Sequence, residues 1–111
     1  MIIGAAVVEL HVRGSRSLKA KRGVVRSLVS RLRNRFNLSV AEVGGQDTWQ
    51  RAVLGLAAAG TDRAFVRQLL ERAVAFIDEQ HLAERLAVDF EIADLPYDEG
   101  PDPIDMDEEG E

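Results

Sequence analysis

The sequence predicts an α+β domain with the ferredoxin-like order βαββαβ, in which a four-stranded antiparallel sheet carries two helices on one face. Three observations lead to this prediction. Four segments alternate apolar and polar residues with the period of two that is typical of strands. Two segments repeat apolar residues every three or four positions, as amphipathic helices do. The six segments form two strand–helix–strand halves, and 111 residues suffice for one such domain.

The first half of the chain predicts a strand, a helix and a second strand. Residues 2–12 alternate in polarity, and the loop after them ends at Ser17, which is suited to cap the next helix. This helix is expected to run to about Phe36, with one apolar stripe facing the sheet. The stripe contains Leu18, Val25, Leu28, Val29, Leu32 and Phe36. Residues 38–43 predict a short strand, and the two glycines within 44–47 predict a turn.

The second half repeats this order. Residues 49–59 alternate as a strand, and Thr61 or Asp62 is expected to cap a helix that runs to about His81. Residues 86–93 predict the last strand. The first and third strands should occupy the centre of the sheet.

The sheet face away from the helices is expected to be apolar on its central strands. It would present Ile3, Ala5, Val7, Val53, Ala57 and Ala59. Because an apolar patch of this size is rarely left in water, we expect a second copy of the chain to cover it. The sequence therefore predicts a homodimer with Ile3, Val7 and Val53 in its interface.

The net charge of −5 is distributed unevenly along the chain. Residues 1–36 hold nine Lys or Arg and one acid, whereas residues 94–111 hold nine acids and no base. This division predicts a ferredoxin-like domain over residues 1–95 and an acidic, flexible tail over 96–111. Before residue 94 there are 14 basic and 10 acidic residues, which leaves a charge of about +4.

The start of the first helix carries a cluster of basic and hydroxyl side chains that is expected to bind anions. Its members are Arg13, Arg16, Ser17, Lys19, Lys21, Arg22 and Arg26. Free backbone N–H groups and cations at a helix start favour a phosphate or carboxylate. The alternative is a solvated basic turn with Ser17 as a helix cap. The acidic tail could contact this cluster and compete with phosphates. The alternative is a tail that keeps the protein in solution and does not dock on the domain.

Trp49 is a candidate for stacking on a nucleic-acid base, since it stands among the polar residues before the third strand. The alternative is a packing anchor. The central strands offer no aromatic side chains, so base stacking on the open sheet face is not expected.

Two runs of sequence resemble a known family. The run SLKAKR at 17–22 and the run SVAEVGGQDTWQRAVLGLA at 39–57 closely resemble the small YlxP-like bacterial family of uncharacterised function. The resemblance covers about residues 1–95 and implies the ferredoxin-like fold. Members of the family are often encoded among translation and ribosome-maturation genes, which implies a partner containing RNA.

No catalytic constellation is found in the sequence. Phosphate hydrolases of the acylphosphatase kind share the topology, but here the loop after the first strand lacks their glycine-rich cradle, and the third strand has no suitable Asn. The absence of cysteine and the separation of His11 and His81 argue against a metal site or another cofactor. No apolar run is long enough to span a membrane.

The function expected is that of a cytoplasmic, non-enzymatic protein that binds RNA or the ribosome through phosphates. The alternative is a homo-oligomeric structural or regulatory domain that binds no nucleic acid. A phosphate-ester hydrolase is a third, weaker hypothesis.

Overall fold

The computed structural model describes residues 1–98 and 100. Its elements confirm the predicted order βαββαβ, with bounds that differ from the predicted ones by at most two residues. The elements are β1 (Ile2–His11), α1 (Leu18–Arg35), β2 (Ser39–Gly44), β3 (Arg51–Gly60), α2 (Arg63–Glu79) and β4 (Glu84–Asp94).

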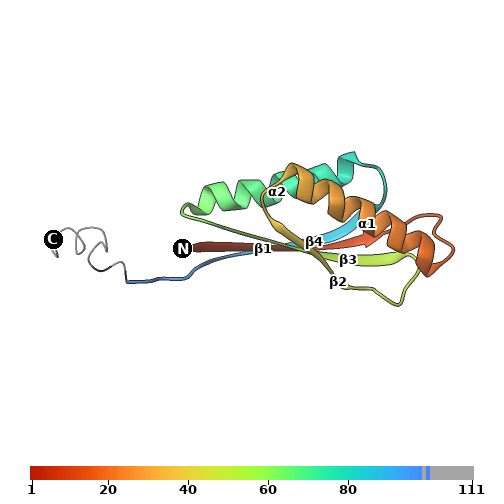
Figure 1. The fold of residues 1–111 in the computed structure, drawn as a ribbon, viewed down its shortest axis with the longest axis horizontal. Coiled ribbons are helices and arrows are strands. Elements are labelled where there is room, and N and C mark those ends of the chain that lie inside the picture. Colours follow the sequence, from red (N-terminus) through yellow and green to blue (C-terminus); the bar gives the residue numbers. More distant parts are fainter. Residues whose placement is uncertain (99, 101–111) are drawn as a thin grey trace, which may run out of the picture.

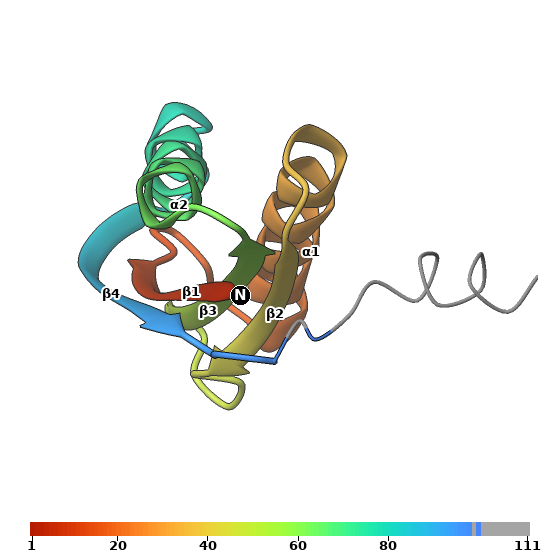
Figure 2. The same cartoon turned by 90° about the vertical axis from the view of Figure 1, so that its left-hand side faces the viewer.

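The four strands form one antiparallel sheet in the order β2-β3-β1-β4, so β1 and β3 are central as predicted. β1 pairs with β3 from Ile2↔Gly60 to His11↔Arg51, and with β4 along its other edge. Both helices lie on one face of the sheet and leave the other face open (Figure 2). This is the ferredoxin-like α+β fold that the periodicity predicts.

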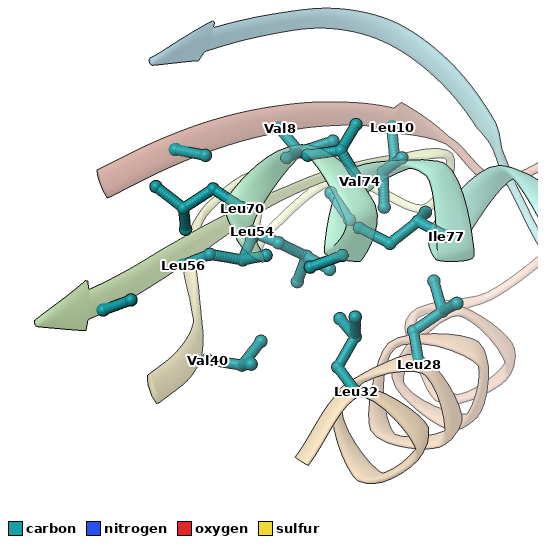
Figure 3. Packing of buried hydrophobic residues seen from close by; sticks show 14 of the residues in the cluster. Val8, Leu10, Leu28, Leu32, Val40, Leu54, Leu56, Leu70, Val74 and Ile77 are labelled. Carbon is teal, nitrogen blue, oxygen red and sulfur yellow. The ribbon is translucent and has the colours of Figure 1, made fainter. Parts of the chain in front are cut away.

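The hydrophobic core lies between the sheet and the two helices (Figure 3). Alternate residues of β1 and β3 point towards the helices because side chains of a strand alternate between its two faces. They meet the apolar stripes of α1 and α2, which repeat every three or four residues. The core includes Val8, Leu10, Leu28, Leu32, Val40, Leu54, Leu56, Leu70, Val74 and Ile77.

A side chain caps the N-terminus of each helix. The Ser17 hydroxyl accepts a hydrogen bond from the backbone N–H of Ala20 at 3.0 Å. The carboxylate of Asp62 accepts one from the N–H of Phe65 at 2.8 Å, so Asp62 rather than Thr61 caps α2. Each cap satisfies an N–H group that the helix itself leaves without a partner.

Different segments of the chain lie at the two ends of the sheet. At one end lie the β1–α1 connection, the start of α1 and the β2–β3 loop (Figure 1). At the other end the backbone of Leu95 pairs with Met1, through N–H···O=C contacts of 2.8 and 2.9 Å. Since β1 spans ten residues, these ends are about 30 Å apart.

The chain leaves β4 at the end opposite the start of α1. The predicted acidic tail lies outside the described residues apart from Pro96, Tyr97, Asp98 and Gly100. Its expected contact with the basic cluster therefore stays a prediction. None of the helices in residues 1–98 is both long and apolar enough to cross a bilayer.

Candidate functional site

The β1–α1 and β2–β3 loops pack against each other beside the start of α1. The backbone N–H of Val12 donates to the Gln50 carbonyl at 2.8 Å. The Gln50 side-chain amide donates to the Ser15 carbonyl at 3.3 Å. The Ser15 hydroxyl in turn donates to the Ser17 carbonyl at 3.1 Å, and Ser15 is buried. These bonds join two segments that are 35 residues apart in sequence into one surface.

Four of the predicted anion-binding cations are exposed on this surface. They are Arg16, Lys19, Arg22 and Arg26. Within the described part of the chain none of their side chains has a hydrogen bond or an ion pair, and the first turn of α1 holds no acid. Positive charges beside the positive end of a helix repel it, by about 0.3–1 kcal/mol each at exposed positions. An anion bound here would relieve that repulsion.

Arg13 is exposed but already paired. Its guanidinium donates to Oε2 of Glu84 from Nη2 at 2.9 Å and from Nε at 3.2 Å, and Nδ1 of His11 lies 3.8 Å from the same oxygen. The hydrogen bond and charge of Arg13, followed by the charge of His11, hold the pKa of Glu84 below its ordinary value. Arg13 therefore borders the basic surface as a neutralised cation. Ser17, for its part, is the cap of α1.

The structure corrects the prediction for Lys21, because this side chain is buried and does not face solvent. Its ammonium donates to the backbone carbonyls of Gly45 and Arg51, the latter at 3.2 Å, and lies 3.4 Å from Oε2 of Glu42. Three partners thus surround the three N–H bonds of the ammonium, as a buried charge requires. Lys21 cannot bind an external anion in this position.

A sequence signal for the burial of Lys21 was present and was missed. At 100° per residue, Lys21 falls between Leu28 and Leu32 on the apolar stripe of α1. Its identity as lysine led to its assignment to the exposed cluster. The Oε2 atom of Glu42 is also buried and accepts no hydrogen bond within the described chain, with the ammonium as its ionic partner.

The Lys21 ammonium fixes both ends of the β2–β3 loop. Gly45 is the first residue of this loop and Arg51 the first of β3, so the two carbonyls on Lys21 bracket the residues between them. Gly45 has a φ of +74°, and a Cβ there would lie 2.7 Å from the Arg51 carbonyl oxygen. Only glycine permits this close approach. Lys21 of α1 therefore fixes the β2–β3 loop at both of its ends.

Trp49 lies in this loop with its side chain exposed. Its exposed fraction is 55%, and it does not belong to the core cluster. Trp49 is therefore not an anchor of the main core, although part of its side chain is covered. Stacking of Trp49 on a base stays a prediction.

The sequence analysis named three apolar residues on the open sheet face, and two of them are exposed there. Ile3 and Val7 are exposed, by 37% and 47%. Val53 is a correction, because its side chain is only 9% exposed; this residue lies between Gly44 of β2 and Glu9 of β1 in the sheet. Val43, which the sequence analysis did not name, is 55% exposed at the same edge.

Residues 1–98 contain no group of three His, Cys, Asp or Glu side chains close enough to hold a metal ion. The chemistry that the exposed cluster offers is charge recognition: guanidinium and ammonium donors suited to phosphate or carboxylate oxygens.

Comparison with known proteins identifies the family. A family model described as "Protein of unknown function (DUF503)" matches residues 3–90. The chain is also similar to a protein of Bacillus subtilis (strain 168) described as "Uncharacterized protein YlxP". The two are 42% identical over 84 residues, which cover 76% of this chain and 91% of that protein. The YlxP-like resemblance of the two sequence runs is thereby confirmed, and the chain belongs to the family described as "Protein of unknown function (DUF503)".

Proposed function

We propose that this protein is a non-enzymatic, cytoplasmic RNA-binding protein whose α1 contacts the phosphate backbone. The observation that carries the proposal is the group of four exposed cations from the loop before α1 to the middle of that helix, whose side chains have no partner within the described chain. Neutralising phosphates with such side chains releases condensed counterions and drives binding without regard to base sequence.

The spacing of the cations suits a chain of phosphates. Lys19, Arg22 and Arg26 share one face of α1, and seven residues of helix separate the first from the last by about 10 Å. One strand of a duplex presents a phosphate about every 3.4 Å of axis, so several phosphates pass this stretch. The charge of about +4 before residue 94 gives the same preference for a polyanion.

Reversing two of these charges is the direct test. The double variant Lys19→Glu/Arg22→Glu is expected to bind a labelled single-stranded RNA of unrelated sequence at least about tenfold more weakly at low salt. The slope of log K against log salt should become shallower by about 1.4, since two phosphate contacts are lost and each contributes about 0.7 on a single strand. Fluorescence anisotropy over a salt series measures both quantities.

The matched control reverses two exposed cations on α2. Arg63→Glu/Arg72→Glu changes the net charge by the same amount but leaves α1 intact. Affinity within about threefold of wild type is expected for this control. Equal losses in the two double variants would show that net charge alone drives binding, and the assignment to α1 would be wrong.

A second candidate function, self-association, is favoured by the open sheet face. Exposed Val7 and Val43 line a depression of about 450 Å³ that Gly55 and Ala57 also line. Small side chains there would let another chain approach the sheet closely. A dimer at tens of micromolar in sedimentation equilibrium, abolished by Val7→Glu, is expected if this face pairs with itself. A monomer at every concentration would contradict it.

A further inference from the structure

Trp49 is exposed in the loop between β2 and β3. Trp49 is the single Trp of the chain, and more than half of its side chain is in contact with solvent. Its neighbours Thr48 and Gln50 are exposed as well. An indole in this position contributes little to the core, so its apolar face is available to a partner.

The loop that carries Trp49 is held in place rather than free. Lys21 binds the carbonyls of Gly45 and Arg51, and Thr48 N–H donates to Gly45 O at 3.1 Å within the loop. The Gln50 carbonyl accepts from Val12 on the far side. Because these bonds are made before any ligand arrives, little conformational entropy is lost when Trp49 engages one.

Trp49 also lies next to the basic surface. Gln50 donates to the Ser15 carbonyl at 3.3 Å, and Trp49 and Arg16 are each one residue away from this contact. Arg16 is exposed, and its side chain has no hydrogen bond or ion pair within the described residues. The two joined loops thus carry an exposed indole and an exposed guanidinium at the same end of the sheet, and proteins combine such aromatic faces with cations when they bind a single nucleic-acid strand.

We propose that the protein binds RNA as a single strand, with one unpaired base stacked on Trp49 and the adjoining phosphates on Arg16 and the cations of α1. This inference rests on the proposed function and adds the class of RNA. The bases inside an RNA duplex cannot stack on Trp49 in this way, because their faces are stacked on one another and closed to the indole. Since every base has a π-face, the stacking selects unpaired bases and not a sequence.

The single tryptophan supplies the readout. Intrinsic fluorescence is measured while the full chain is titrated with an unstructured oligo(U) of about 12 nucleotides, and separately with an RNA duplex of the same length, a size within the range that one binding site covers. Labelled copies of both follow binding by anisotropy. The oligo(U) is expected to quench the Trp49 emission saturably, in step with its binding curve. The duplex is expected to bind through phosphates and leave the emission unchanged.

The outcomes separate the two proposals. If oligo(U) binds with unchanged emission, the stacking inference is overturned while RNA binding stands. If neither RNA binds, the proposed function fails and this inference fails with it. Equal quenching by the duplex and by oligo(U) also overturns the inference, because the response then does not depend on unpaired bases.

Substitutions at exposed aromatic residues provide the second measurement. Trp49→Ala is expected to weaken oligo(U) binding by about tenfold at an unchanged salt slope, since the phosphate contacts remain. Trp49→Phe should recover most of the affinity, because a smaller ring still stacks. The control is Phe65→Ala, which removes a side chain that is 60% exposed at the start of α2, and it should bind as wild type. A loss that Trp49→Phe does not recover, or one equalled by Phe65→Ala, would overturn the stacking.

Discussion

Replacing Lys21 with Met is expected to lower the free energy of unfolding by about 3 kcal/mol. The variant keeps the length of the side chain but removes the ammonium. The carbonyls of Gly45 and Arg51 then lose a donor, and the buried Oε2 of Glu42 loses its only ionic partner within the described chain. Glu42 is 22% exposed, so water reaches part of the carboxylate and limits the loss. Urea denaturation followed by far-UV circular dichroism measures the change.

Two further variants identify the cause of that loss. Lys19→Met removes an exposed lysine two residues earlier on the same helix, and its effect should stay within about 0.5 kcal/mol. Lys21→Met/Glu42→Leu should recover part of the stability, because it removes the carboxylate that the single variant leaves unpaired. Recovery should be incomplete, since both carbonyls still lack a donor. A single variant at Lys21 within about 1 kcal/mol of wild type would show that the buried pair contributes little.

Adding one methyl group at Gly4 is expected to cost about 2 kcal/mol of stability. Helix α2 packs directly on the backbone of β1 at this residue. A Cβ on Gly4 would lie 2.5 Å from Cγ1 of Val66, 2.8 Å from Cδ1 of Leu70 and 3.0 Å from Cδ1 of Ile92. All three side chains belong to the core or pack against it, so none can move aside without disturbing others. Thermal and urea unfolding of Gly4→Ala measure the cost.

The same substitution at Gly23 is the control and should have the opposite sign. Gly23 lies inside α1, is exposed, and has no atom within 4 Å of an added Cβ. Gly23→Ala is expected to stabilise the protein by about 0.5–1 kcal/mol, because alanine loses less backbone entropy in a helix. If both variants were stabilising, α2 would not be packed on β1 as closely as the structure places it.

The candidate site was predictable where it depended on one segment of chain. Arg16, Lys19, Arg22 and Arg26 were expected at the start of the first helix, and the structure leaves all four exposed there. Lys21 could have been separated from them by its position on the helix wheel. Its partners could not have been named, because they belong to β2, β3 and the loop between these strands and meet Lys21 only when the sheet forms.

The sequence by itself determined the element order and the two faces of each element. Side chains recur with periods of 3.6 in a helix and 2 in a strand, and this follows from local backbone geometry. It also determined that Ser17 caps α1.

Tertiary structure decided three further matters. It buried Lys21 under the β2–β3 loop, covered Val53 within the sheet, and left Trp49 in solvent. Each of these outcomes depends on which distant segments pack together. Such contacts are set by how the whole chain fills its core and satisfies its buried polar groups, which no short stretch of sequence specifies.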